Sequence, residues 1–282
     1  MAMKASMHSG RTGSARHNDR TFLRGQDNVQ EIAPHIDTNK TEQNVVRQIA
    51  GRTESLEVTE LKVYKKLFSA SLDATNRRYR AQGHTERCKT IEELYRGRQT
   101  RPEETIYQIG NAEHSVSPQE LRSCYWDYMQ KILNWNEKHG RPMIILNWSL
   151  HADETTPHVH VRRVWRYKDA DGNWRIGQNR ALEAAGVPLP HPDRPAGRYN
   201  NRKMTFDKMS RTMWIETCRD HGIEIDDVPT QGIRHKDKQE FLTGKISKLQ
   251  TELDKYHHLE ERHPEDFRRM RQQEHRKTRF ER

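Results

Sequence analysis

The chain has 282 residues, of which 32% are hydrophobic and 32% are charged. This hydrophobic share is below that of an ordinary globular domain, so we expect one compact domain and a segment that adds little to the core. No apolar run approaches the ~20 residues of a membrane helix. Fifty Lys and Arg against 40 Asp and Glu give a net charge of +10, which favours nucleic acid as the partner.

The chain also lacks the sequence features of a secreted protein. The stretch 1–24 is polar and basic, and the three cysteines are isolated from one another. A signal peptide and a disulfide framework are therefore not expected. We predict a cytoplasmic protein with no membrane insertion.

Hydrophobic periodicity and turn residues predict the secondary structure. The helix expected from residue 118 has Ser117 as its N-cap, Pro118 at its first position and Glu120 three residues after the cap, and Gly140 stands where a C-terminal cap belongs. In chain order, the predicted elements are strand 3–8, helices 54–81 and 90–98, strand 105–109, helix 118–140, strands 143–151, 158–167 and 173–176, a proline-rich loop over 187–195, and helix 206–221.

The order of these elements indicates the fold class. Strands follow one another through hairpins rather than through helical crossovers, which is typical of an α+β fold with an antiparallel sheet and helices on one side. We expect the domain to occupy residues 1–230. Residues 231–282 are mostly charged and helix-forming and end in a basic stretch, so we predict a charged helical extension there.

The segment 151–160, HADETTPHVH, is the most informative part of the sequence. On a strand, His158 and His160 point to the same face, and the preceding strand ends at His151. Because neighbouring strands lie about 5 Å apart, three imidazoles from two strands can converge on one divalent cation. A carboxylate of the connecting loop, Asp153 or Glu154, could bind the same metal or accept a ring N–H.

The type of ligand narrows the choice of metal. Neutral imidazoles suit transition metals, so we expect Mn²⁺ first, with Zn²⁺ and Mg²⁺ as alternatives. A zinc protease would need its histidines at helix spacing, and here they stand at strand spacing. The alternative to a metal site is a surface hairpin that happens to be rich in histidine.

Three sequence motifs resemble those of a known family. His158-Val159-His160 resembles the histidine–hydrophobic–histidine signature of the HUH endonucleases, which cut single-stranded DNA. The longer block 151–160 is similar to the third motif of plasmid mobilisation relaxases of the Mob/Pre (MobV) group, also called plasmid recombination enzymes. Residues 16–20, RHNDR, resemble its first motif, and residues 35–44 resemble its second, with Lys40 where Arg is usual. The match runs to about residue 230.

The resemblance implies a relaxase. Such an enzyme nicks one strand at a plasmid transfer origin, stays covalently attached to the 5′ end and later reseals the strand. It implies a five-stranded antiparallel sheet flanked by helices, with the metal on the central strands. The implied ligands are His151, His158 and His160, with Glu154 as a further ligand or as a partner of one.

The nucleophile implied by the resemblance is His17, which would form a phosphoramidate. A neutral imidazole nitrogen can attack a phosphodiester directly, and the charges of Arg16 and Arg20 would favour the neutral ring. In the alternatives, His17 only contacts phosphate, or a tyrosine is the nucleophile. The tyrosine candidates are Tyr64, Tyr79 and Tyr95. The pattern assigns no role to the second-motif residues His35, Asp37 and Asn44.

The region after the histidines is strongly basic. Residues 161–219 hold 13 Arg and Lys against six Asp and Glu, with Trp165, Trp174 and two tyrosines interleaved. Such a mixture suits a single-stranded backbone with stacked bases, although the two tryptophans could equally be core residues. The expected DNA contacts are Arg16, Arg162, Arg163, Arg166, Arg202 and Lys203.

The expected partner is therefore DNA, namely the single-stranded transfer origin and the adjacent duplex. The extension could also contact a coupling or accessory protein, or form a homodimer. Two other functions would use a similar site. A rolling-circle replication initiator would share the nicking chemistry at a replication origin, and a metal-binding DNA-recognition protein would have no catalysis.

Overall fold

The computed structural model describes residues 2–25, 33–48 and 54–227, and some residues between 247 and 265. Contacts divide the chain into two units, Met1–Asp227 and Val228–Arg282. The described residues of the second unit are mostly helical. Most of the predicted extension, including its basic end, lies outside the described residues. Every element named below belongs to the first unit.

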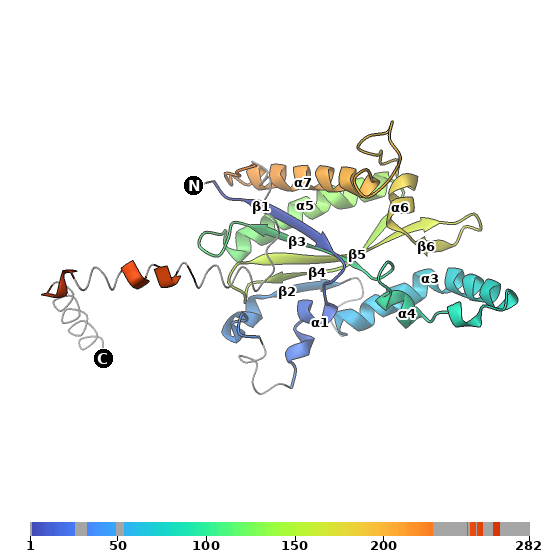
Figure 1. Ribbon diagram of the computed structural model, residues 1–282, viewed down its shortest axis with the longest axis horizontal. Coiled ribbons are helices and arrows are strands. Elements are labelled where there is room, and N and C mark those ends of the chain that lie inside the picture. The colour runs from blue at the N-terminus through green and yellow to red at the C-terminus, as the bar shows by residue number, and fades with distance from the viewer. Residues whose placement is uncertain are drawn as a thin grey trace. The chain divides into compact units, whose positions relative to one another are not determined.

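The first unit is built on an antiparallel sheet with the strand order β1-β3-β5-β4-β2, and β6 pairs with β5 (Figure 1). The strands are β1 (Ala5–Gly10), β2 (Val45–Gln48), β3 (Glu103–Ile109), β4 (Met143–His151), β5 (His158–Lys168) and β6 (Trp174–Ile176). The prediction of an α+β fold with an antiparallel sheet of about five strands is confirmed. Because β4 and β5 each have a neighbour on both sides, the predicted histidine strands lie inside the sheet.

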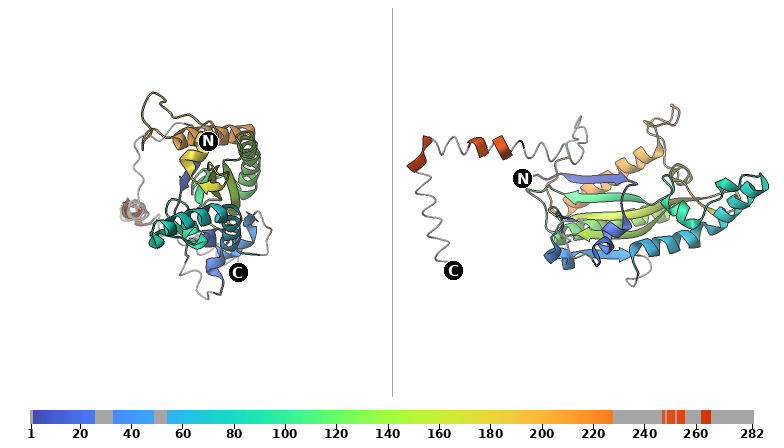
Figure 2. Two further views of the ribbon diagram at one scale, coloured as in Figure 1. Left: turned by 90° about the vertical axis from the view of Figure 1, so that its right-hand side faces the viewer. Right: turned by 60° about the horizontal axis from the view of Figure 1, so that its bottom comes forward.

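Helices cover both faces of this sheet (Figures 1 and 2). Helices α5 (Pro118–Lys138) and α7 (Arg202–Asp220) lie on one face, where Tyr107, Trp165 and Trp214 belong to the main core. Helices α1 (Ala15–Asn18) and α3 (Leu56–Ala81) lie on the other face. The pattern of elements alone favoured helices on one side, and this expectation was wrong.

Most predicted elements are present with shifted ends. The Ser117 side chain accepts from the Glu120 amide and Gly140 has a φ of 77°, so the predicted caps of α5 are confirmed. Helix α7 begins four residues earlier than predicted because Asn201 caps it. The sequence analysis missed β2, α1, α6 (Gln178–Ala184) and the short helices η1 (Thr21–Leu23), η2 (Thr38–Gln43) and η3 (Thr85–Arg87). It found α4 (Ile91–Arg96).

The alternation of side chains along β5 decides what each face receives. Val159, Val161 and Trp165 point into the core under α5 and α7. The even-numbered residues from His158 to Val164 lie on the opposite face and point towards α1 and α3, where Val164 packs against Tyr64 and Phe68. The two histidines of β5 therefore face α1. Among the described helices, none combines the length and the apolar composition that crossing a membrane requires.

Candidate metal centre

The histidines of β4 and β5 lie together, as the hairpin geometry led us to expect. His151 stands directly opposite His158 in the strand register, and His160 stands opposite Ser149. The ring centroids are 5.3 Å apart for His151 and His158, 4.6 Å for His151 and His160, and 4.8 Å for His158 and His160. Their function as metal ligands stays a prediction.

The surroundings fix which nitrogen of each ring is available. His151 Nε2 lies 3.2 Å from the carbonyl oxygen of Asn18, and His158 Nδ1 lies 2.8 Å from that of Thr156. A carbonyl oxygen only accepts, so both of these nitrogens carry the proton. The nitrogens left to bind a cation are His151 Nδ1 and His158 Nε2. Such hydrogen bonds orient ligand histidines in metal sites.

His160 is held in the same way by a carboxylate that the sequence analysis missed. Its Nδ1 lies 3.0 Å from Glu104 Oε1, and Asn18 donates to the other Glu104 oxygen at 2.8 Å. Although burial opposes ionisation, these hydrogen bonds and the charge of Arg162 lower the pKa of Glu104 to about 2. The carboxylate is therefore ionised and accepts the Nδ1 proton, which leaves His160 Nε2 as the ligand atom.

Two of these available nitrogens are buried without a hydrogen bond. Among the described residues, His151 Nδ1 and His160 Nε2 have no hydrogen-bond partner. Leaving a buried polar atom unpaired costs about 1–3 kcal/mol, and a cation would remove that cost at both atoms. The cluster therefore fits a bound metal better than it fits a histidine-rich surface turn.

Glu154 lies at the centre of the cluster. Its Oε1 is 3.4 Å from His151 Nδ1, and its Oε2 is 3.9 Å from His158 Nε2. Burial opposes its ionisation, but its close contacts with His151, His17 and the guanidinium of Arg20 hold the pKa of this carboxyl well below its usual range. It adds an ionised oxygen to the nitrogen donors. Potential ligand atoms fall within 4.8 Å of one another in two groups, His151–Glu154–His158 and His17–His151–His160.

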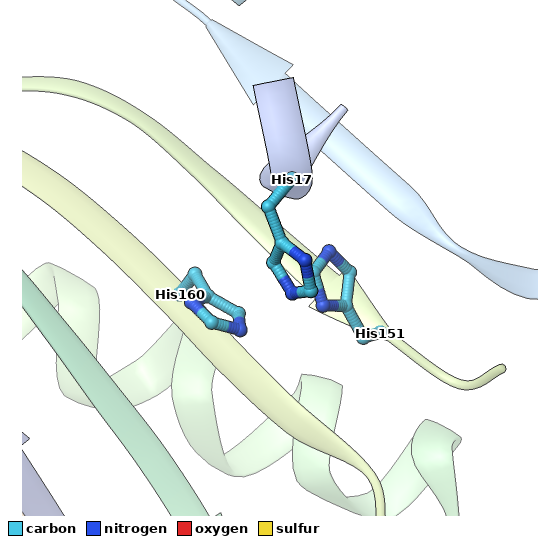
Figure 3. Close-up of side chains that lie close together, drawn as sticks. All are labelled: His17, His151 and His160. Carbon is cyan, nitrogen blue, oxygen red and sulfur yellow. The ribbon is translucent and has the colours of Figure 1, made fainter. Parts of the chain in front are cut away.

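His17 reaches this cluster from a distant part of the sequence. It lies on α1, and its ring centroid is 5.2 Å from that of His151 and 5.5 Å from that of His160 (Figure 3). Its side chain is 31% exposed, whereas His151 is fully buried. His17 is thus the histidine of the cluster that a substrate can contact most directly.

Arg20 links His17 to the carboxylates. Its Nη1 lies 3.3 Å from His17 Nε2, and its Nη2 lies 2.8 Å from Glu154 Oε1. A guanidinium only donates, so the first contact requires an unprotonated His17 Nε2. Arg20 is buried and has a φ of 57°, a conformation that non-glycine residues adopt mainly where the surroundings impose it.

Asp153 joins this first motif to the second. It is fully buried and accepts from Arg20 Nε at 3.0 Å, Asn44 Nδ2 at 2.7 Å and Thr41 Oγ1 at 3.1 Å. The Asp37 amide also donates to the Asp153 carbonyl oxygen at 2.7 Å. Asn44 and the Asp37 backbone therefore position the β4–β5 loop, which is the role that the sequence pattern could not assign.

The remaining second-motif residue, His35, is exposed and stacks on His17 with a centroid distance of 6.4 Å.

The tyrosines that were the alternative nucleophiles are less favourable than His17. Tyr64 is buried and donates to the Thr100 carbonyl oxygen, and Tyr95 is buried and donates to Glu60. Burial raises the pKa of both hydroxyls.

Tyr79 lies elsewhere in the first unit. It lines a hollow between α3 and β6 that contains none of the clustered histidines. None of the three tyrosines is placed as a nucleophile at this cluster.

Two residues predicted to contact DNA are instead part of the interior. Arg162 is 3% exposed and pairs with Glu60 at 2.6 Å and Glu104 at 3.3 Å, while Arg163 is 2% exposed and lies 3.4 Å from Glu103. The adjacent glutamates of β3 face the adjacent arginines of β5 in the strand register. This Glu-Glu against Arg-Arg pattern was the sequence signal of a buried network, and it contradicts direct DNA contact by Arg162 and Arg163.

The other basic candidates differ in exposure. Arg166 is buried, with its guanidinium 3.8 Å from the centroid of the Trp174 ring. Arg202 pairs with Glu183 at 2.8 Å, and Lys203 pairs with Asp207. Arg16 is exposed beside His17, with no ion pair among the described residues. Of the interleaved tryptophans, Trp165 is a core residue.

The role of Glu104 can be tested by removing its charge. We expect Glu104→Gln to lower the affinity for Mn²⁺ about 10–100-fold, because the partner of a ligand histidine raises its basicity and fixes its orientation. Isothermal titration calorimetry measures this affinity. Glu103→Gln is the matched control, since Glu103 is equally buried on the same strand but pairs with Arg163 instead of His160. Equal metal affinities in the two variants would contradict the role of Glu104.

The metal-free protein should lose stability in mild acid. Burial is the main cause that lowers the pKa of His151, His158 and His160. The unfolded chain, with histidine pKa values near about 6.5, then binds more protons than the folded chain, so stability rises with pH through this window. We expect the free energy of unfolding, measured by urea denaturation in a chelator, to fall as the pH is lowered from about 7.5 to 5.5. A constant value would contradict the neutral imidazoles.

Comparison with known proteins adds a likeness to solved structures. No protein-family model and no curated protein matches the chain. A Mn-bound crystal structure at pH 6.8 of the MobM relaxase domain (MOBV; Mob_Pre), bound to plasmid pMV158 oriT DNA, is 17% identical and covers 86% of this chain and 99% of its own, with a TM-score of 0.48. A second such structure, at pH 4.6, is 16% identical, covers 86% and 100%, and has the same TM-score.

Proposed function

We propose that this chain is a metal-dependent DNA strand transferase of the relaxase type. It nicks one strand at a plasmid transfer origin, forms a covalent bond to the 5′ phosphate and later reseals the strand in plasmid mobilisation or recombination. The observation that carries the proposal is the position of His17, which lies against the histidine–glutamate cluster. The bond between Arg20 and Asp153, which are 133 residues apart in sequence, joins the segment of His17 to the loop of the cluster. The three motifs that resemble those of relaxases thus meet at one place.

The donor set supports a divalent transition metal. His151 Nδ1, His158 Nε2 and His160 Nε2, the ring nitrogens left free by the hydrogen bonds of the other three, would hold it, with Glu154 as a fourth donor or as a charge beside it. Mn²⁺ is our first assignment because imidazole and carboxylate together suit it, and Mg²⁺ and Zn²⁺ are the alternatives. A bound cation would draw charge from the oxygens of the scissile phosphate.

The reaction uses His17 as the nucleophile. His17 Nε2 is unprotonated because it accepts a hydrogen bond from Arg20. The lone pair of this nitrogen attacks the phosphorus in line. A P–N bond forms while the bond from phosphorus to the 3′ oxygen breaks. The ring gives up its Nδ1 proton and the 3′ oxygen gains a proton, so the products are a phosphoramidate and a free 3′-hydroxyl. Arg20 adds positive charge beside the developing negative charge.

Residues 1–230 would form the nicking domain, and 231–282 an appended segment that contacts duplex DNA, a coupling protein or a second copy of the chain. Arg16 is the residue from our sequence-based set that we retain as a DNA contact. The exposed Arg16 beside the partly exposed His17 ring is consistent with single-stranded DNA as the substrate.

A nicking assay tests this function. Supercoiled plasmid carrying the DNA that flanks the gene is incubated with the protein and Mn²⁺, and the products are examined for a nick and a protein–DNA adduct. We expect both, with an acid-labile adduct, and neither in the presence of a chelator. An acid-stable adduct would show a tyrosine nucleophile. Nicking at a replication origin would assign a replication initiator, and binding without nicking would leave a recognition protein.

A further inference from the structure

A small hollow beside α1 has an unusual charge. Its volume is about 220 Å³, and it lies between the segment that leads into α1, the start of α3 and the end of α4. The residues that line it are Gly13, Ser14, Ala15, Arg16, Glu57, Tyr95, Arg96, Arg101, Pro102 and Arg162. Four arginines against one glutamate surround it, and its wall includes the residue directly before His17.

Three of these arginines form no ion pair with a described carboxylate, although Glu57 also lines the hollow. Arg162 is already paired with Glu60 and Glu104. In residues 2–25, 33–48 and 54–227, no ion pair joins Arg16, Arg96 or Arg101 to a carboxylate. Like charges gathered around a small space repel one another, and burial of part of a charged group strengthens the repulsion. An anion in the hollow would relieve it.

Arg101 provides a second and independent observation. Its Nε atom is buried and has no hydrogen-bond partner among the described residues. A guanidinium presents several donors in a fixed planar arrangement that matches a phosphate group. Arg101 therefore lies in the wall of a positively charged hollow with donor capacity that no described residue uses, which fits an anion with several oxygens.

We propose that this hollow binds a second backbone phosphate of the DNA strand, next along the chain from the phosphate that His17 attacks. Arg16, Arg96 and Arg101 would contact it. The inference rests on the proposed function, because it takes single-stranded DNA as the ligand. A second fixed phosphate beside the first would hold the strand in register, so that the nucleophile meets one phosphorus rather than its neighbours.

Arg96→Gln and Arg101→Gln, singly and together, test this site. The probe is a fluorescent oligothymidylate of about 20 nucleotides, and binding is followed by anisotropy in a chelator. Removal of one phosphate contact from a single strand should make the slope of log affinity against log salt shallower by about 0.7. We expect the double variant to bind about tenfold more weakly with this shallower slope. Arg80→Gln, an exposed arginine at the far end of α3, should behave as the wild type.

Thermal unfolding of each variant checks that it folds, which we expect because Arg96 and Arg101 make no ion pair with any described carboxylate. If the double variant matches Arg80→Gln in both affinity and salt slope while the wild type still nicks DNA, this hollow is not a phosphate site and the proposed function stands. If the wild type neither nicks plasmid nor binds the oligonucleotide, the proposed function fails and this inference fails with it.

Discussion

His17→Ala is expected to abolish the covalent protein–DNA adduct, with a loss of at least about a thousandfold, because removing a nucleophile eliminates the covalent route. Binding of Mn²⁺ should change little, since three other histidines and Glu154 remain. The adduct is measured on a denaturing gel with labelled single-stranded DNA, and metal binding by calorimetry. Together, the two measurements distinguish a nucleophile from a metal ligand, the two roles that the geometry allows for His17.

The competing role is that of a metal ligand, because His17 also forms a close group with His151 and His160. In that case His17→Ala would weaken Mn²⁺ binding as strongly as the loss of His160. His114→Ala is the control, since His114 is exposed and no potential metal-binding group in the described chain includes it. A variant that lacks His17 and still forms the adduct at the normal rate would exclude the nucleophile role, and unchanged Mn²⁺ affinity in that variant would exclude the ligand role.

His160→Ala should lower the affinity for Mn²⁺ at least about a hundredfold and reduce nicking in proportion. Removing a direct ligand should weaken binding more than removing its partner Glu104, for which we expect about 10–100-fold. His160 Nε2 is buried and unpaired, and Glu104 holds its ring in place. Calorimetry measures the affinity, and nicking is measured over a range of Mn²⁺ concentrations. A high concentration of metal should restore part of the activity.

His139→Ala is the matched control, because that histidine bonds to the Trp135 carbonyl oxygen and has no place in the cluster. If His160→Ala binds Mn²⁺ as the wild type does, the cluster is not the metal centre. If metal binding is lost but nicking persists, the reaction does not need the cation, and the proposed mechanism is wrong.

The sequence predicted those parts of the structure that are determined by residues close to one another in the chain. Alternation along 158–167 and the six-residue connection after His151 predict a hairpin, and a hairpin alone brings the rings of β4 and β5 together. Likewise, Ser117, Pro118 and Glu120 define the start of α5 within four residues. In both cases the interacting residues are close in the chain, so their spacing carries the information.

Long-range contacts could not be predicted in this way. The burial of Arg162 depends on Glu60, which lies on α3 and is 102 residues away in sequence. A count of basic residues carries no information on this pairing, so the sequence analysis wrongly expected Arg162 to be exposed and to contact DNA. The short strand β2 has only four residues and becomes visible through its pairing with β4. The position of His17 depends on Arg20 and Asp153, and here the resemblance of the motifs, rather than periodicity, indicated the result.

The location of the histidines on interior strands has a consequence for how the centre assembles. β4 and β5 are each hydrogen-bonded on two sides, and their other faces are sealed by the main core. The ligand frame is therefore preorganised by folding itself, unlike a zinc finger, which orders only around its ion. A cation bound by these residues would then be able to leave and return while the scaffold retains its shape.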